Sequence, residues 1–346
     1  MARTEPRAEA PSTKDQLTKI FTDDGDTAGA TGGTDGNGAA SRPSLGTRLK
    51  YACVIRRVEF LPGHIPQVIG PAMLGAASWG EFASLNSVLA MLWMISGLQI
   101  GNMINALADR EVDLQLKSRQ SDAIYGIGVS RVITHIALST ALFVAVAAFL
   151  AVRTQHWDLL AYAAAFLVLA FSYSLPPLFL KSSGAPQLPT LQVTCCLIPG
   201  IAIVRSFDGA TDWTLAFTIV GIAMLVTSLF VTSHAEDYVE DAKFGIRTYV
   251  HAFGLTGTML VQSAMLFFGS IIVLGTVWAQ SGLNWGFVPF IIAWAMSQRL
   301  MWAATSVARR APLDEAMEYF HKKSLLGPYH SALMSWTLVI LAAFTV

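Results

Sequence analysis

Three polar side chains recur at every fourth position where a long apolar segment ends. They are Asn105, Asp109 and Asp113, in the run Asn-Ala-Leu-Ala-Asp-Arg-Glu-Val-Asp. Residues four apart in an α-helix lie about 40° round from one another, so the three side chains share one face. Carboxylates at the edge of a membrane segment are costly and usually functional. We therefore expect this face to bind a ligand, in preference to a solvated helix end balanced by Arg110.

A second acidic pair, Asp237 and Asp241, has the same spacing and also follows an apolar run. Mg²⁺ takes oxygen ligands in octahedral geometry, commonly one or two carboxylates together with phosphate oxygens. The sequence therefore predicts one ion on the aspartates of the first stretch, one on those of the second, and a diphosphate between them. Asn105 is suited to orienting that ligand, and Glu236 and Glu240 are alternative ligands beside the second pair.

The segment Tyr173-Ser-Leu-Pro-Pro-Leu-Phe-Leu-Lys181 adds a phenol and an ammonium. The two prolines end a helix, which would leave Tyr173 inside the bundle and Lys181 at its rim. A buried tyrosine beside an ionising substrate can hydrogen-bond the leaving oxygen or stabilise a cation with its ring. The lysine would bind diphosphate as a point charge. Further candidates for binding the diphosphate are Lys117, Arg119, Lys243 and Arg247, and Arg56 and Arg57 could also face the site.

The composition indicates what must position these groups. Hydrophobic residues make up 53% of the 346 residues and charged residues only 13%, against about 25% charged in soluble domains. Apolar runs of about 20 residues, long enough to cross a membrane, fall at roughly 62–80, 84–108, 129–152, 157–180, 187–206, 213–236, 257–279, 284–306 and 329–346. The sequence therefore predicts an all-α integral membrane bundle of about nine transmembrane helices over residues 48–346.

Residues 1–47 are rich in Gly, Thr and Asp and cannot bury enough apolar surface to fold, so we expect a disordered tail. Basic residues gather in alternate loops, which places the N-terminus and both acidic stretches on the cytoplasmic side of a cell membrane. The formal net charge is zero, so a nucleic-acid partner is not expected. The three cysteines show no disulfide or zinc spacing.

Together, Asn105-x-x-x-Asp109-x-x-x-Asp113, Asp237-x-x-x-Asp241 and Tyr173…Lys181 resemble the motifs of the UbiA superfamily of intramembrane prenyltransferases. The resemblance covers the chain from about Arg48 to its end. It implies an isoprenyl diphosphate substrate, two Mg²⁺ ions on the two acidic motifs, and prenyl transfer to a lipophilic or aromatic acceptor within the lipid bilayer. It also implies metal-binding roles for the four aspartates and catalytic roles for Asn105, Tyr173 and Lys181.

The sequence departs from this family in two places. Many members carry Arg-Thr-x-x-Arg-Pro-Leu after the first motif, whereas here the stretch after Asp113 retains only Lys117 and Arg119 as basic residues. Ser233 stands where many members have a further Asp. A branch of the superfamily cyclises its C15–C25 polyprenyl diphosphate and needs no acceptor, so transfer, ranked first, and terpene cyclisation both stay open. A cation transporter is a third reading, but it would place acidic residues mid-membrane instead of at one edge.

Overall fold

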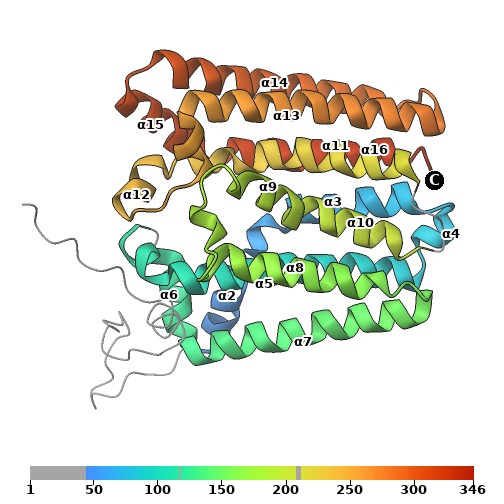
Figure 1. The fold of residues 1–346 in the computed structure, drawn as a ribbon, viewed down its shortest axis with the longest axis horizontal. Coiled ribbons are helices and arrows are strands. Elements are labelled where there is room, and N and C mark those ends of the chain that lie inside the picture. The colour runs from blue at the N-terminus through green and yellow to red at the C-terminus, as the bar shows by residue number, and fades with distance from the viewer. Residues whose placement is uncertain (1–43, 117, 208–211) are drawn as a thin grey trace, which may run out of the picture.

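The computed structural model describes residues 44–116, 118–207 and 212–346, which form helices joined by short connections (Figure 1). No β-strand occurs within this part of the chain, and the predicted all-α class is confirmed. The predicted tail up to residue 43, and Lys117, lie outside the described residues. The first described helix, α2, begins at Leu45, slightly before the predicted boundary at residue 47.

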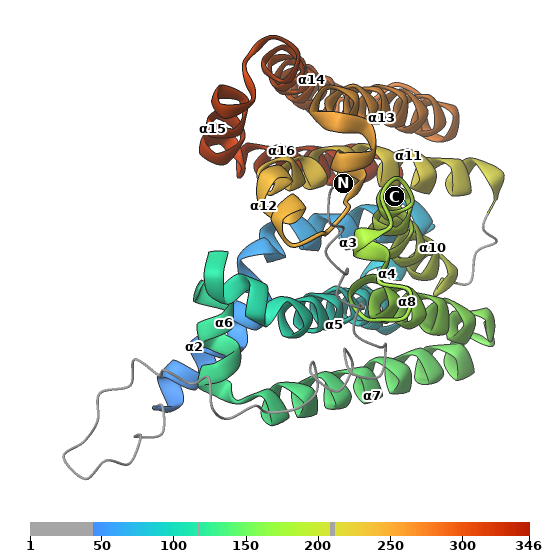
Figure 2. The same ribbon diagram turned by 60° about the vertical axis from the view of Figure 1, so that its left-hand side comes forward.

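The bundle has two halves, each with its own apolar core (Figure 2). In the first half, the rings of Trp93, Phe143 and Phe166 stack in sequence, with centroids 5.3 and 5.5 Å apart. Gly97 allows this packing, because a Cβ there would lie 2.7 Å from the Phe143 ring. The helices of this half are α2 (Leu45–Ile55), α5 (Leu85–Leu116), α6 (Ser118–Ile127), α7 (Val129–Thr154), α8 (Asp158–Ser174) and α10 (Ile198–Arg205).

The second half is built on α11, which packs against α13 and α16, while α14 packs on α13 and α16. Gly221 of α11 and Gly269 of α13 let two backbones approach closely, since a Cβ on Gly269 would lie 2.7 Å from the Gly221 carbonyl oxygen. The helices here are α9 (Gln187–Gln192), α11 (Trp213–Phe230), α12 (Tyr238–Lys243), α13 (Tyr249–Ser281), α14 (Phe287–Arg310), α15 (Leu313–Lys323) and α16 (Leu326–Ala342).

Helix α3 (Leu61–Gly75) joins the two halves. Val68 and Ala72 belong to the first core, whereas Met73 and Leu74 belong to the second. Pro66 and Pro71 lie within the helix, where packing by the surrounding bundle makes them tolerable. The short 3₁₀ turn η1 (Val58–Phe60) precedes α3, and α4 (Trp79–Phe82) follows it.

Each of the nine predicted apolar segments contains a helix, but the count of nine spans is not confirmed. Within the described part of the chain, five helical stretches are long and apolar enough to cross a membrane: Leu85–Leu114, Val129–Thr154, Gln187–Arg205, Trp213–Ala235 and Tyr249–Ser281. The pair α15 and α16, bent by 46°, gives a sixth if it is counted as one span. The helices of the remaining three segments do not meet the length and apolarity expected of a span. Helices α3 and α8 have only 15 and 17 residues, and α14 carries the polar residues Gln298 and Arg299 at its centre.

Candidate active site

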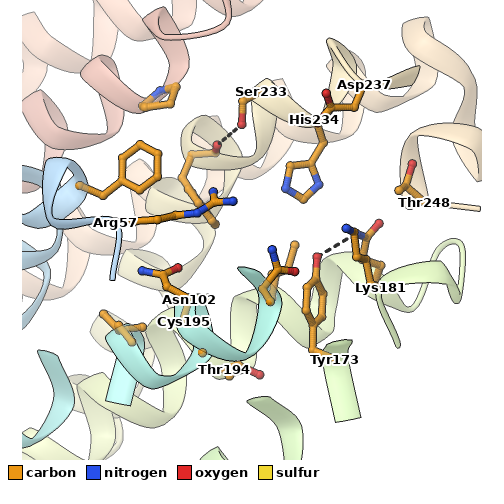
Figure 3. Close-up of a pocket in the computed structure, with 18 of the residues that line it drawn as sticks. Arg57, Asn102, Tyr173, Lys181, Thr194, Cys195, Ser233, His234, Asp237 and Thr248 are labelled. Atoms are coloured by element: carbon orange, nitrogen blue, oxygen red, sulfur yellow. Dashed lines mark hydrogen bonds between the residues drawn. The ribbon is translucent and has the colours of Figure 1, made fainter. Parts of the chain in front are cut away.

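A cavity of about 310 Å³ lies between the two halves of the bundle. Its walls come from α3, α5, α8, α9 with the following turn η3 (Val193–Leu197), α11, η4 (Val231–Ala235) and α12, together with the start of α16 (Figure 3). Polar side chains gather where α12 and the Lys181 loop meet α5, and apolar side chains line the interior. The cavity thus has a charged region and an apolar chamber.

The first acidic stretch occupies the last turns of α5, which continues beyond the apolar core. Asn105, Asp109 and Asp113 all line the cavity, as the spacing of four predicts, and each aspartate is only 9% exposed. Ser174 of α8 donates a hydrogen bond to Asn105 Oδ1 at 3.3 Å, which fixes the amide against the neighbouring helix. Ser121 of α6 donates to the Arg110 carbonyl oxygen at 2.5 Å and holds α6 against this end of α5.

The second acidic stretch does not continue α11 as a regular helix. After Phe230 the chain tightens into the 3₁₀ turn η4, and Asp237 then precedes the first residue of α12. The Asp241 N–H donates to the Asp237 carbonyl oxygen at 2.8 Å, so the two residues stay one turn apart. Both line the cavity, and Glu236 and Glu240 line it as well.

The two acidic stretches therefore face one cavity from opposite halves of the bundle. Among the described residues, no three Asp, Glu, His or Cys side chains are grouped closely enough to hold a metal ion by themselves. Pairs of aspartates on two sides of one cavity suit Mg²⁺, which commonly takes one or two carboxylates and completes its shell with water and phosphate oxygens. Glu240 Oε2 is buried without a hydrogen-bond partner in the described structure, as expected of an oxygen that faces a cation. The donor set fits magnesium.

Tyr173 and Lys181 lie on either side of the turn that ends α8. The helix ends at Ser174, because Leu175 adopts the extended conformation favoured before a proline. Lys181 Nζ then lies 2.5 Å from Asp109 Oδ2, and Tyr173 Oη accepts a hydrogen bond from Gln187 Nε2 at 3.0 Å. Both residues line the cavity and are partly buried.

The family model for the UbiA prenyltransferase family matches residues 66–324. This chain belongs to that family. It is an integral, multi-pass membrane protein, as its apolar helices indicate. No protein of curated function matches the sequence.

Solved structures of the UbiA family share the fold at low sequence identity. A UbiA homolog from Archaeoglobus fulgidus bound to GPP and Mg²⁺ is 16% identical, with a TM-score of 0.53 over 83% of this chain and 99% of that chain. A digeranylgeranylglyceryl phosphate synthase is 16% identical, with a TM-score of 0.56 over 86% and 99%. The apo UbiA homolog from Aeropyrum pernix K1 is 18% identical, with a TM-score of 0.54 over 83% and 97%.

Of the four cations predicted to bind diphosphate in this UbiA-family chain, the three that the structure describes do not line the cavity. Arg119 pairs with Glu59 at 3.5 Å with its side chain 67% exposed, and neither Lys243 nor Arg247 lines the cavity. Lys117 lies outside the described residues. Arg57, which the sequence analysis named as a further cation that could face the site, does line the cavity, held by a hydrogen bond from its Nη2 to Gln120 Oε1 at 3.1 Å. The diphosphate roles of the four predicted residues stay predictions.

Several lining residues were not singled out by the sequence analysis. They are His64 and Gln67 on α3, Asn102 on α5, Gln187 on α9 and Thr194 on the π-helical turn η3 (Val193–Leu197). Asn102 alone could have been found by spacing, since it precedes Asn105 by one turn. The others come from segments far apart in sequence, and only packing brings them to the cavity.

Proposed function

We propose that this chain is an Mg²⁺-dependent intramembrane enzyme that ionises an isoprenyl diphosphate and transfers the prenyl group to a lipophilic or aromatic acceptor. One observation carries the proposal: a single cavity joins two acidic segments, Tyr173 and Lys181 to an apolar chamber. The chamber is formed by Leu98, Phe166, Ala170, Leu191 and Val226. An amphipathic substrate with a diphosphate head and a hydrocarbon tail matches this division.

The charged region would bind the diphosphate. Asp109 and Asp113 on one side, and Asp237 and Asp241 on the other, would hold Mg²⁺, which when bound neutralises the diphosphate and favours breaking of the allylic C–O bond. Lys181 would add a positive charge at the same place. The released diphosphate then remains at the charged end of the cavity.

The interior would protect the allylic cation. Phe166 and Ala170 are 1% and 5% exposed, and their wall excludes water that would otherwise trap the cation as an alcohol. Tyr173, one turn from Ala170 on α8, lies between this wall and the charged region. Its phenol is placed to donate to the oxygen that leaves, and its ring to face the cation.

A second polar wall favours transfer over cyclisation. Arg57, just before η1, His64 and Gln67 on α3, and Asn102 on α5 line the cavity in addition to the acidic stretches and Lys181. A hydrocarbon undergoing cyclisation has no use for these hydrogen-bonding groups, whereas an acceptor with a hydroxyl or acidic group would bind them. Cyclisation remains the second candidate, because the chamber is lined by Phe166 and Phe230, whose rings can stabilise a migrating cation.

We further propose that the charged end of the cavity faces the cytoplasm. The support is the excess of Lys and Arg in the loops at that end of the bundle, which the positive-inside tendency assigns to the cytoplasm. Cysteine labelling from either side of sealed vesicles tests this orientation, with Ser182→Cys near the cavity and Asn284→Cys in the α13–α14 loop as the opposed pair.

The deciding experiment is a product assay on the purified protein in detergent. Geranyl, farnesyl, geranylgeranyl and geranylfarnesyl diphosphates are supplied with Mg²⁺, first without an acceptor and then with aromatic and quinone-type acceptors. Diphosphate release that depends on an acceptor, with a prenylated product, supports transfer. A cyclic hydrocarbon formed without an acceptor would show that the enzyme cyclises its substrate instead of transferring the prenyl group. No diphosphate release under any condition would overturn the ionising activity itself.

A further inference from the structure

Gln187 forms a buried bridge between two tyrosines from different helices. Its Oε1 accepts from the Tyr249 backbone N–H at 2.8 Å, and its Nε2 donates to Tyr173 Oη at 3.0 Å. A backbone N–H can only donate, so the amide oxygen must face Tyr249 and the NH₂ must face Tyr173. The carboxamide therefore has one permitted orientation, and Gln187 is 0% exposed.

This orientation determines what the Tyr173 hydroxyl can do. A phenol oxygen has one hydrogen to donate and can also accept. Since Gln187 Nε2 uses the oxygen as an acceptor, the hydrogen of Tyr173 must point elsewhere. Tyr173 lines the cavity, and its hydrogen bond with Gln187 is the one that the described structure gives to its hydroxyl. The O–H is thus left to the substrate.

The partner of Gln187 is itself held rigidly. Tyr249 Oη donates to the Val231 carbonyl oxygen at 2.7 Å and accepts from Gln262 Nε2 at 2.8 Å. Val231 is the first residue of η4, the turn that leads into the second acidic stretch. Both Tyr249 and Gln262 are 0% exposed, so this chain of bonds is shielded from competing water.

Two hydrogen bonds to the backbone of Arg247 place Gln187 at this position. The Arg247 N–H donates to Ser182 Oγ at 2.8 Å, and the Gly184 N–H donates to the Arg247 carbonyl oxygen at 2.8 Å. Gly184 has a φ of 70°, which a side chain would strain. The loop after Lys181 is therefore fastened to the segment that follows the second acidic stretch, and Gln187 completes this connection.

We propose that Gln187 is a positioning residue that makes Tyr173 a hydrogen-bond donor to the diphosphate end of the substrate and couples it to the second acidic stretch. The inference rests on the proposed function, because it assigns the donor that assists departure of the diphosphate oxygen. The hydrogen bond from Tyr173 should affect turnover more than ground-state binding, since the negative charge on the diphosphate oxygen grows as the C–O bond breaks.

The test is a double-mutant cycle on the full-length protein with Mg²⁺ and the best allylic diphosphate. The variants are Gln187→Met, Tyr173→Phe and the double variant, with diphosphate release as the readout. Loss of a hydrogen bond to a charged oxygen predicts a fall in kcat of about 10- to 100-fold in each single variant, with KM changed by less than about threefold. The double variant should be no slower than Tyr173→Phe, because Gln187 acts through the hydroxyl that Phe lacks.

A second variant separates positioning from folding. In Gln187→Glu one oxygen still accepts from the Tyr249 N–H, and the other faces the Tyr173 phenol and donates only while the carboxyl is protonated. Its turnover relative to wild type should therefore fall as pH rises. Gln298→Glu is the matched control, because Gln298 is buried, bonds to Ser263 and does not line the cavity. The turnover of this variant relative to wild type should not change with pH.

The outcomes are distinct. Losses that multiply in the double variant, or a Tyr173→Phe variant as fast as wild type, would overturn the role of Gln187 while leaving the proposed function intact. A pH-independent loss in Gln187→Glu would do the same, since it would indicate a structural role. A wild-type protein that releases no diphosphate would overturn the proposed function and this inference with it.

Discussion

Lys181 Nζ lies 2.5 Å from Asp109 Oδ2 and so connects the loop after α8 with the cavity face of α5. The two side chains are only 19% and 12% exposed. Burial acts to lower the pKa of the Lys181 ammonium, but the Asp109 carboxylate more than offsets this and holds that pKa above its usual range. The lysine is therefore charged. With the proposed ligands bound, the diphosphate would take the Lys181 ammonium and Mg²⁺ would take the Asp109 carboxylate.

We expect Lys181→Met to raise KM for the isoprenyl diphosphate by about 10- to 100-fold, the usual effect of losing a charge-assisted hydrogen bond. Steady-state kinetics at saturating Mg²⁺ measures this effect. Lys322→Met is the control, because Lys322 is exposed and pairs with Glu318 four residues earlier on α15. Equal KM values for the two variants would show that Lys181 does not bind the diphosphate.

Removing one carboxylate from either acidic stretch should affect the metal requirement. We expect Asp113→Asn and Asp237→Asn each to lower kcat by about 100-fold or more, because a poorly held ion stabilises less charge in the transition state. Chelation with EDTA should abolish wild-type turnover and added Mg²⁺ should restore it, with the helical content unchanged by circular dichroism.

Asp158→Asn is the matched control for these carboxylate changes. Asp158 pairs with Arg205 at 2.7 Å and does not line the cavity. Its kcat and its half-saturating Mg²⁺ concentration should therefore match those of wild type. A normal Mg²⁺ titration in both Asp113→Asn and Asp237→Asn would contradict the two-sided metal site.

The apolar chamber should limit the length of the isoprenoid. Ala170→Leu adds three carbons to a wall residue that is 5% exposed, and we expect it to lower kcat/KM for the longest accepted diphosphate by about tenfold relative to the shortest. Competition between geranyl and geranylgeranyl diphosphate measures the ratio. Ala165→Leu, on the exposed face of the same helix, should leave this kcat/KM ratio unchanged. An equal shift of the ratio in the two variants would show that the isoprenoid tail lies outside this chamber.

Close packing beside the second acidic stretch should be sensitive to a single methyl group. A Cβ on Gly327 of α16 would collide with Thr232 Oγ1 and lie 2.5 Å from the Leu229 carbonyl oxygen. We expect Gly327→Ala to lower the free energy of unfolding by about 1–3 kcal/mol, as overpacking does, and to lower turnover by displacing η4.

Thermal unfolding in detergent measures the stability change at Gly327. Gly275→Ala is the control, because a Cβ on Gly275 of α13 would meet nothing within 4 Å. Alanine should be tolerated there, since it favours the helical conformation relative to glycine. Equal stability of the two alanine variants would show that α16 can move away from η4 at little cost.

The sequence by itself determined the class of the molecule and which residues of its acidic motif share a helix face. Apolar runs and few charges required membrane helices, because unsatisfied backbone groups cannot be left in lipid. A spacing of four placed Asn105, Asp109 and Asp113 on one face, since helical geometry is local and repeats. Consecutive prolines ended α8 before Lys181, because proline restricts the residue before it.

Only the tertiary structure decided which distant groups share the cavity. Gln187 is 14 residues beyond Tyr173, and its contacts with Tyr173 and Tyr249 depend on how α8, α9 and α13 pack. The basic residues illustrate the same limit: the sequence offered both Arg57 and Arg119 as candidates, whereas packing brought Arg57 to the cavity and left Arg119 exposed. Helix periodicity fixes directions within one helix, but the contacts between helices depend on side-chain packing along their whole length, which no short motif encodes.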